Sequence, residues 1–507
     1  MDVSALTMLR QSGEAGGGRG ACTATPCSAA LEHFHFRCTH KHQAHRGLFQ
    51  EKTHFDYLRV KTRSGNALVS YDQEVNPDEN GLMRNDVSYL RSRAPLSRRD
   101  FVKAATVAGL GLTAARSTLA SATTSRCNRV LAYVGTDTKP VDGPANGKGI
   151  YLFELQTNTG ELVLLKLAAE TTSPSWLTFH PSGRYLYAVN EVSDYRGNSG
   201  SVSAFLVNRE SGDLQLLNVV NSGGAGPTHM SVDASGKFAF VANYLGGSFA
   251  VLPILPDGSL REASYVHTDQ GSVSKEYAKN AKPGSFAISG HDTPHAHMIQ
   301  ADPTNRFVLE TDLGQDRIYV YQFNDRTGAL TPAAIPFVTV PAGDGPRHFA
   351  FHPNGRWMYS IQEEASTIIC FRYDGHTGAL TPEQTLSALP EGFAGTSFGS
   401  EIAVSPDGRV LYAANRLHNS IAIFAIAPDG KLSPVGEALT QGDYPNQFTL
   451  DPSGRFLFVC NQRSDQITSF RIDKVSGKLA FTGHYQSLGT PMCMAFLPAA
   501  AARRSTT

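Results

Sequence analysis

The chain has 507 residues, of which 18% are charged, and its 45 Lys and Arg residues equal its 45 Asp and Glu residues. This balance gives no global field that would attract nucleic acid or an anionic membrane. Gly (47) and Pro (27) are frequent, and Val, Tyr, Phe and Thr recur in short runs, so the composition favours strands joined by tight turns. Cysteine (7) is too sparse in a chain of this length for a disulfide framework.

The first part of the chain, residues 1–96, shows neither helical nor strand periodicity. We predict that it is disordered or belongs to an over-extended reading frame whose true start is Met83. The stretch HFHFRCTHKHQAH is rich in histidine, but its spacing fits no closed zinc site, so we predict no metal there.

Residues 97–122 resemble a twin-arginine export signal, with an amphipathic helix as the alternative. Arg98 and Arg99 precede a moderately apolar stretch, and Ala120-Ser121-Ala122 offers the small residues that a signal peptidase requires. We expect a periplasmic or secreted protein that has no membrane attachment after signal removal. A cytoplasmic protein is the alternative if export does not happen.

From residue 123 to 498 one pattern recurs six times: an apolar strand, a turn resembling Asp/His/Ser-Pro-x-Gly-Arg, and a second apolar strand. FHPSGRYLYAVNE, FHPNGRWMYSIQE and LDPSGRFLFVCNQ are three of the copies. Pro presets φ for the first turn position, and Gly supplies the positive φ of a later one. Two further strands follow each copy, which predicts four-stranded units of about fifty residues, typical of β-propeller blades.

Counting these units predicts an all-β, seven-bladed β-propeller. The C-terminus ends on one apolar strand, MCMAFLP, whereas the mature N-terminus offers three strands and lacks the first one. We predict that the two ends together build the seventh blade, which removes free sheet edges. Residues 499–507 are predicted to be a disordered tail. A two-domain β-sandwich is the alternative, and it does not explain the repeat.

Chemically active side chains fall at the ends of the predicted strands. The first strand of a blade lines the central channel and its neighbour runs antiparallel, so the start of the first and the end of the second share one face. We therefore predict that His297 and Arg347 lie near Glu363 and Arg416 at one mouth of the channel. The same rim is expected to carry Glu191 and four residues predicted to contact a substrate: His229, His295, Glu401 and Arg463.

These residue types suit attack on a carbonyl group in a small anionic molecule, without metal or cofactor. Guanidinium groups bind carboxylate or phosphate, histidine transfers protons near neutral pH, and fixed cations stabilise an oxyanion. His348 directly follows Arg347, so strand alternation predicts that it points to the opposite face and serves packing. His180 and His352 lie in turns at the far end, and we expect structural roles for them.

A short motif, GTSFG at Gly395–Gly399, matches the nucleophile elbow G-x-S-x-G. The elbow needs a strand before the serine and a helix after it. Here a glycine-rich loop precedes a strand, so we predict a chance match.

Four segments resemble the seven-bladed propeller lactonases, which include a bacterial type of 6-phosphogluconolactonase and the fungal carboxy-muconate cyclases. The segments are PHAHMIQADPTNRFVLETDLGQDRIYVYQF, GPRHFAFHPNGRWMYSIQE, SEIAVSPDGRVLYAANR and YPNQFTLDPSGRFLFVCNQ. The resemblance implies that a lactone ring is opened or closed, with His297 or Glu363 as general acid/base. It implies that Arg347 and Arg416 bind the acid group and the oxyanion. Gln362 departs from the Asn that is frequent in the family.

Several questions of function stay open at the level of sequence. Phosphorylated sugar lactones are cytosolic, so export would point to an unphosphorylated sugar lactone or an aromatic-acid lactone. A non-catalytic propeller that binds a ligand or protein on its rim, and a periplasmic redox propeller, are the other classes. We expect a monomer without a nucleic-acid partner. The insertion SVSKEYAKNAKPGSFAISGHDTPHAH is expected to cover the channel mouth and to influence substrate choice.

Overall fold

The computed structural model describes residues 58–62, 65–69, 129–139, 145–273 and 275–499. The chain divides into two units, residues 1–119 and 120–507. In the first unit, β1 (Leu58–Thr62) and β2 (Gly65–Val69) form an antiparallel hairpin. We had expected no strand within residues 1–96. The predicted start at Met83 and the export signal at 97–122 lie outside the described residues.

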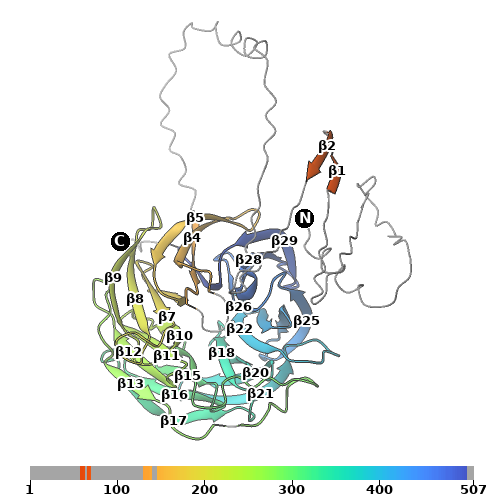
Figure 1. Cartoon of the computed structure of the whole chain (residues 1–507). Helices are drawn as coiled ribbons and strands as arrows, with labels where there is room; N and C mark the ends of the chain where they lie inside the picture. The colour runs from red at the N-terminus through yellow and green to blue at the C-terminus, as the bar shows by residue number, and fades with distance from the viewer. Residues whose placement is uncertain (1–57, 63–64, 70–128, 140–144, 274, 500–507) are drawn as a thin grey trace, which may run out of the picture. The chain divides into compact units, whose positions relative to one another are not determined.

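The second unit is a ring of seven four-stranded antiparallel sheets, which confirms the predicted propeller (Figure 1). Blade 1 comprises β6 (Pro174–Phe179), β7 (Tyr185–Asn190), β8 (Ser201–Val207) and β9 (Leu214–Asn221). Blade 2 comprises β10 (Pro227–Val232), β11 (Phe238–Asn243), β12 (Ser248–Pro253) and β13 (Tyr265–Thr268). Blade 3 comprises β14 (Ala296–Ala301), β15 (Phe307–Asp312), β16 (Arg317–Phe323) and β17 (Leu330–Thr339).

The remaining blades follow the same plan. Blade 4 comprises β18 (Pro346–Phe351), β19 (Trp357–Gln362), β20 (Thr367–Asp374) and β21 (Ala379–Ser387). Blade 5 comprises β22 (Phe398–Val404), β23 (Val410–Arg416), β24 (Ser420–Ile426) and β25 (Leu432–Leu439). Blade 6 comprises β26 (Pro445–Leu450), β27 (Phe456–Asn461), the short 3-10 helix η1 (Gln462–Ser464), β28 (Gln466–Ile472) and β29 (Leu479–Ser487).

Blade 7 joins the two ends of the propeller, as predicted. Its strands are β30 (Pro491–Phe496), β3 (Val130–Thr136), β4 (Gly149–Gln156) and β5 (Glu161–Glu170), in that order. Val134 pairs with Met494, and Tyr133 pairs with Ala495. The C-terminal strand therefore completes a sheet that begins more than three hundred residues earlier in the chain.

The turn between the first two strands of each repeat has the predicted conformation. Gly183, Gly355 and Gly454 have φ of 63°, 67° and 64°, in the left-handed region that glycine adopts without strain. Asn305 takes the same place in blade 3, with φ of 57°. The imidazole of His352 contacts the carbonyl of Gly408 in the next blade at 2.8 Å, which fits its expected structural role.

The core lies between the blades. Seven clusters of buried hydrophobic side chains occupy the seven seams, so each blade packs on both faces. Tyrosines on the second strands also form hydrogen bonds to the next blade. The hydroxyl of Tyr359 donates to the carbonyl of Gly430, and that of Tyr412 donates to the carbonyl of Gly477, both at 2.8 Å. Among the described residues no helix is long and apolar enough to cross a bilayer.

Candidate active site in the central channel

Every inner strand contains a β-bulge near its start, and these bulges build the wall of a central cavity. Along β18, Pro346 pairs with Gln362 and His348 pairs with Ile361, so Arg347 is an extra residue without its own partner. A bulge places an additional side chain on the strand and re-aims it. The bulged residues that line the cavity are Ser175, Thr228, His297, Arg347, Asn446 and Met492.

The bulge overturns our expectation for His348. Strict alternation would turn His348 away from Arg347, but both residues line the cavity. The register shift between Pro346 and His348 breaks the two-residue period at this point. Trp176 and Gln447, which follow the bulged residues of blades 1 and 6, line the cavity in the same way.

A second ring of wall residues stands at the ends of the second strands. Glu363 directly follows β19, and Arg416 is the last residue of β23. Glu191, Tyr244 and Gln462 hold the same position in blades 1, 2 and 6. With Ser289 from the insertion and Tyr444 they enclose a cavity of about 170 Å³, room for about six waters and therefore for a small molecule rather than a polymer.

Glu363 is the centre of charge in this cavity. One of its oxygens, Oε2, lies 2.9 Å from Nε of Arg347 and 2.6 Å from Nη2 of Arg416. All three side chains are more than nine-tenths buried. Burial raises the pKa of Glu363, but the charges of Arg416 and Arg347 outweigh it, so the pKa lies below the ordinary value. Two cations thus share one carboxylate, and the cluster carries a net positive charge.

The guanidinium groups are also held by the backbone. Nη1 of Arg347 donates to the carbonyl of Ser400 at 2.6 Å, and Nη2 of Arg416 donates to the carbonyl of Gly399 at 3.1 Å. The Arg416 guanidinium also lies over the ring of Tyr444, 5.2 Å from its centroid. Both cations are therefore fixed before any ligand arrives, which is the arrangement that stabilises an oxyanion without reorganisation.

Neutral imidazoles face this charged cluster. The rings of His297 and His348 lie 5.0 Å apart, and the ring of Tyr244 lies 5.4 Å from that of His297. Burial and the charge of Arg347 hold the pKa of both histidines well below the ordinary value. Nδ1 of His348 contacts Oε1 of Glu401 at 3.1 Å, while Nε2 of His348 has no hydrogen-bond partner among the described residues. Both rings are therefore neutral at pH 7, and each has a nitrogen lone pair that can accept a proton.

The insertion places one hydroxyl in the cavity. Oγ of Ser289 lies 2.8 Å from Oε1 of Glu363 and 2.5 Å from Oε1 of Glu364. The amide of Gly395 donates to the carbonyl of Pro283 at 2.9 Å, so the insertion also contacts the loop between blades 4 and 5. The insertion thus reaches the cavity through Ser289, and its expected cover of the mouth and influence on substrate choice stay predictions.

The eight residues predicted for the site fall into two groups. His297, Arg347, Glu363 and Arg416 line the cavity together. The other four do not line it, but each contacts a residue of its wall. Their predicted contact with a substrate stays a prediction. The contacts are His229 with Trp176, His295 with Tyr244, Glu401 with His348, and Arg463 with Tyr444.

Sequence reasoning missed several wall residues. Trp176, Ser289, Tyr444 and Asn446 line the cavity but were not proposed. A signal for the bulges exists in the sequence, because a proline begins the inner strand in five of the seven blades and the bulged residue follows it. That pattern marks Asn446 and Met492, but no comparable signal marks Ser289.

Comparison with known proteins agrees with this geometry. A family model described as lactonase, 7-bladed beta-propeller, matches residues 131–496. The chain belongs to this family. A curated relative, the 6-phosphogluconolactonase of Bacillus subtilis strain 168, is 33% identical over 300 residues, which cover 59% of this chain and 78% of the relative.

Solved structures that match about three quarters of this chain show the same fold. The periplasmic gluconolactonase of Pseudomonas aeruginosa matches with a TM-score of 0.65 and 30% identity, covering 73% of this chain and 99% of that one. A protein from Lactobacillus plantarum matches with a TM-score of 0.65 and 30% identity, covering 73% of this chain and 100% of that one. The two relatives with named activities differ in whether the lactone carries a phosphate.

The GTSFG motif provides no nucleophile to this cavity. Ser397 is buried, and its hydroxyl donates to the carbonyl of Arg416 at 3.0 Å. The strand β22 follows it, where a nucleophile elbow requires a helix. The hydroxyl of Ser397 thus fixes the backbone of a wall residue.

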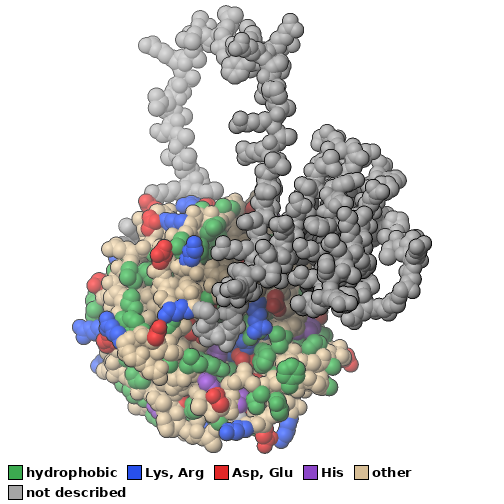
Figure 2. Space-filling view, viewed as in Figure 1, with side chains coloured by type: hydrophobic (Ala, Val, Ile, Leu, Met, Phe, Trp, Pro, Cys, Tyr) green, Lys and Arg blue, Asp and Glu red, His purple; other side chains and the backbone are tan. Residues whose placement is uncertain are grey.

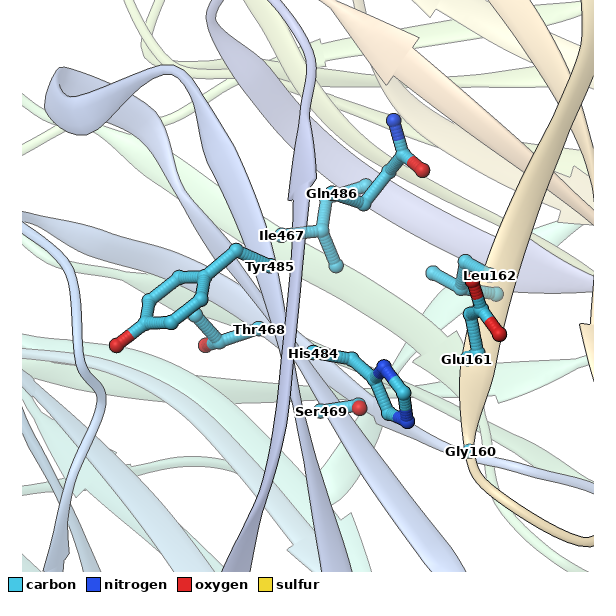
Figure 3. Close-up of a pocket in the computed structure, with 9 residues that line it drawn as sticks. All are labelled: Gly160, Glu161, Leu162, Ile467, Thr468, Ser469, His484, Tyr485 and Gln486. Carbon is cyan, nitrogen blue, oxygen red and sulfur yellow. The ribbon is translucent and has the colours of Figure 1, made fainter. Parts of the chain in front are cut away.

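A second hollow lies at the periphery, between the outer strands of blades 6 and 7 (Figure 3). Glu161 and Leu162 of β5 face His484 and Gln486 of β29 across it. Its volume of about 50 Å³ suits one or two waters, which is too little for a sugar-sized ligand. Figure 2 shows acidic and basic side chains interspersed over the visible face of the propeller, in keeping with the balanced composition.

Proposed function

We propose that this chain is a lactone hydrolase whose active site is the central cavity. The observation that carries the proposal is the cluster of Glu363, Arg347 and Arg416, buried opposite the neutral rings of His297 and His348. Hydrolysis of a lactone needs a fixed positive charge for the oxyanion and a base for the attacking water. The cavity provides both, and its family relatives are named for lactone hydrolysis.

In this mechanism the two arginines bind the carbonyl oxygen of the lactone. His297 removes a proton from a water molecule as the water oxygen attacks the carbonyl carbon, and the negative charge moves to the carbonyl oxygen. The tetrahedral intermediate then collapses: the ring C–O bond breaks, its electron pair stays on the ring oxygen, and that oxygen takes up a proton. Glu363 keeps Arg347 and Arg416 in place throughout.

We further propose that the preferred substrate is an unphosphorylated sugar lactone. Two arginines and two glutamates, Glu363 and Glu191, line the cavity, so its formal charge is zero when the histidines are neutral. A phosphate group brings nearly two negative charges and is bound by an excess of basic groups. A neutral sugar lactone fits this charge balance, and so does the named activity of the periplasmic relative.

Hydrolysis of a lactone panel by the purified protein, with EDTA present, tests both statements. We expect a higher kcat/KM for glucono-lactone than for 6-phosphogluconolactone. The reverse preference would overturn the substrate class but keep the lactonase. No turnover of any lactone by folded protein would overturn the enzyme and favour a ligand-binding propeller.

We also propose export of the chain by the twin-arginine route. The Arg98–Arg99 pair, the apolar stretch after it and the Ala120-Ser121-Ala122 sequence support this proposal. Mass spectrometry of the protein from the periplasmic fraction should show an N-terminus near residue 123. Peptides from residues 1–82 in the precursor would contradict a start at Met83.

A further inference from the structure

The insertion brings a serine hydroxyl between two adjacent glutamates, a contact that the ring of blades does not provide by itself. Oγ of Ser289 is 2.8 Å from Oε1 of Glu363 and 2.5 Å from Oε1 of Glu364. Glu363 faces the cavity, whereas Glu364 is 1% exposed and does not line it. The hydroxyl is therefore the polar link between the cavity and a buried carboxyl group.

Two contacts of this kind require an extra proton. A serine hydroxyl has one proton to donate, and ionised carboxylates only accept. With both glutamates ionised, one of the two short contacts would bring two acceptors together. One carboxyl group must then be protonated, and its proton points at Ser289 Oγ.

The surroundings of the two glutamates decide which one holds that proton. Two arginines contact Glu363, which favours its ionised form. Burial raises the pKa of Glu364, more than the neighbouring His291 lowers it, and Oε2 of Glu364 has no hydrogen-bond partner among the described residues. The amide groups of Ser289 and Gly290 also donate to Oε1 of Glu364, at 3.2 and 3.3 Å, but no cation in the described part of the chain contacts Glu364 as closely as the two arginines contact Glu363. We therefore assign the proton to Glu364.

A buried histidine also lies close to Oε1 of Glu364. Nδ1 of His291 lies 3.6 Å from Oε1 of Glu364, and Nε2 of His291 lies 3.2 Å from Oδ1 of Asp316. Burial opposes its charge, but the ionised forms of these two carboxyl groups raise the pKa of His291 to about 10, so the cation is held most firmly once Glu364 has given up its proton. The charges of Asp344 and Arg416 also act on this cluster, and Tyr244 faces it as a neutral phenol, because burial and the two glutamates raise the pKa of Tyr244.

We propose that Ser289 and Glu364 are positioning residues that relay a proton to Glu363 and so make Glu363 the general acid of the lactonase reaction. The relay rests on the proposed function. Because Glu363 is ionised at rest, the proton of Glu364 first moves to Ser289 Oγ while the hydroxyl proton of Ser289 moves to Oε1 of Glu363. When the ring C–O bond of the intermediate breaks, its electron pair stays on the ring oxygen, which takes this proton from Glu363 and leaves Glu363 ionised again.

The step leaves Glu364 ionised beside protonated His291. Glu364 regains its proton from solvent through the cavity, along the same hydroxyl in the opposite direction. The proton that His297 took from water leaves to solvent, and the product acid ionises. Each turnover thus releases one proton, as hydrolysis of a lactone to a hydroxy-carboxylate requires.

Ser289→Ala is the first variant, Ser289→Thr is its matched control with the hydroxyl retained, and Glu364→Gln removes the dissociable proton. Protonation of the leaving oxygen accelerates the reaction when the leaving group is an alkoxide, as in glucono-lactone. It has little effect when the leaving group is a phenolate, as in dihydrocoumarin, because a phenolate is a much weaker base. We expect Ser289→Ala and Glu364→Gln to lower kcat/KM for glucono-lactone about a hundredfold and that for dihydrocoumarin less than threefold. Ser289→Thr should restore most of the activity on glucono-lactone.

Equal loss on both substrates, or no loss on either, would overturn the relay. If the wild-type protein hydrolyses neither lactone, the proposed function fails, and infrared spectroscopy still tests the proton itself. Other buried carboxyl groups, such as Asp269, also contribute to the protonated-carboxyl band, so the test is the difference spectrum between the wild type and Glu364→Gln at pH 7. The band should lose intensity in Glu364→Gln, and a band of unchanged intensity would show that Glu364 does not hold the proton.

Discussion

At the scale of single residues, the cavity depends on the sharing of Glu363 by Arg347 and Arg416. A buried carboxylate or guanidinium is costly unless it is paired, and here one carboxylate satisfies two cations. The remaining positive charge is available to an oxyanion. The ion pairs that lower the cost of burying these charges therefore also hold the two guanidinium groups where they can stabilise an oxyanion.

Replacing Glu363 by Gln should remove the negative charge that pairs with Arg347 and Arg416. The amide cannot neutralise the two guanidinium groups or act as an acid, so we expect kcat/KM for glucono-lactone to fall by about a hundredfold or more. Two buried cations without a counter-charge should also lower the free energy of unfolding by about 3–5 kcal/mol. Steady-state kinetics and urea unfolding measure the two effects.

The matched control is Glu383→Gln. Glu383 pairs with Arg372 at 3.0 Å on the exposed surface of blade 4, where such pairs contribute little. This variant should keep wild-type activity and stability. A Glu363→Gln protein that remains as active as Glu383→Gln would remove Glu363 from the mechanism.

At the scale of the elements, the seam between blades 2 and 3 contains three buried carboxyl groups. Asp269, Glu310 and Asp312 are all buried there, and neither oxygen of Asp269 or Glu310 has a hydrogen-bond partner among the described residues. Burial, with the charge of Asp312, raises the pKa of Asp269 to about 8, and burial raises that of Asp312 to about 6. The seam is thus most compatible with protonated carboxyl groups.

This seam should make the protein less stable in alkali. The unfolded chain binds fewer protons than the folded one wherever a folded pKa is raised, so stability falls as pH rises from about 4 through 6 and 8. We expect urea midpoints to decrease between pH 6 and pH 9. Asp269→Asn should flatten that decrease, and an unchanged slope in this variant would contradict the assignment to the seam.

At the scale of the whole molecule, closure of the ring depends on the last strand. β30 pairs with β3, and Met494 and Cys493 of β30 belong to the hydrophobic clusters on the two sides of blade 7. Without β30, the edge of β3 and both seams would be exposed, which favours aggregation.

A chain that ends at Thr490 should therefore fail to form a stable monomer. We expect it to elute as aggregate in size-exclusion chromatography and to lose its cooperative thermal transition. A chain that ends at Ala499 is the control, since it keeps all of β30, and it should behave as the full chain does. A folded, monomeric protein without β30 would contradict the role of the closure.

The linear pattern of residues was enough to predict the fold and much of the site. The repeat of apolar strands and Pro-x-Gly turns is local, because turn chemistry and strand pairing with the next neighbour depend on adjacent residues. The lone C-terminal strand and the incomplete first repeat implied the closed seventh blade. Strand direction placed His297, Arg347, Glu363 and Arg416 on one rim together with other polar residues, and the family resemblance singled out these four. The structure places them in one cavity.

What the sequence could not decide depends on contacts between distant segments. The bulge in β18 turned His348 into the cavity against the alternation rule, and the register of a strand becomes known only with its partner. Ser289 reaches Glu363 because the insertion folds across the blades, which no periodicity records. The raised pKa of Glu364 and the lowered pKa of His297 arise from burial, a property of the assembled ring and not of the chain.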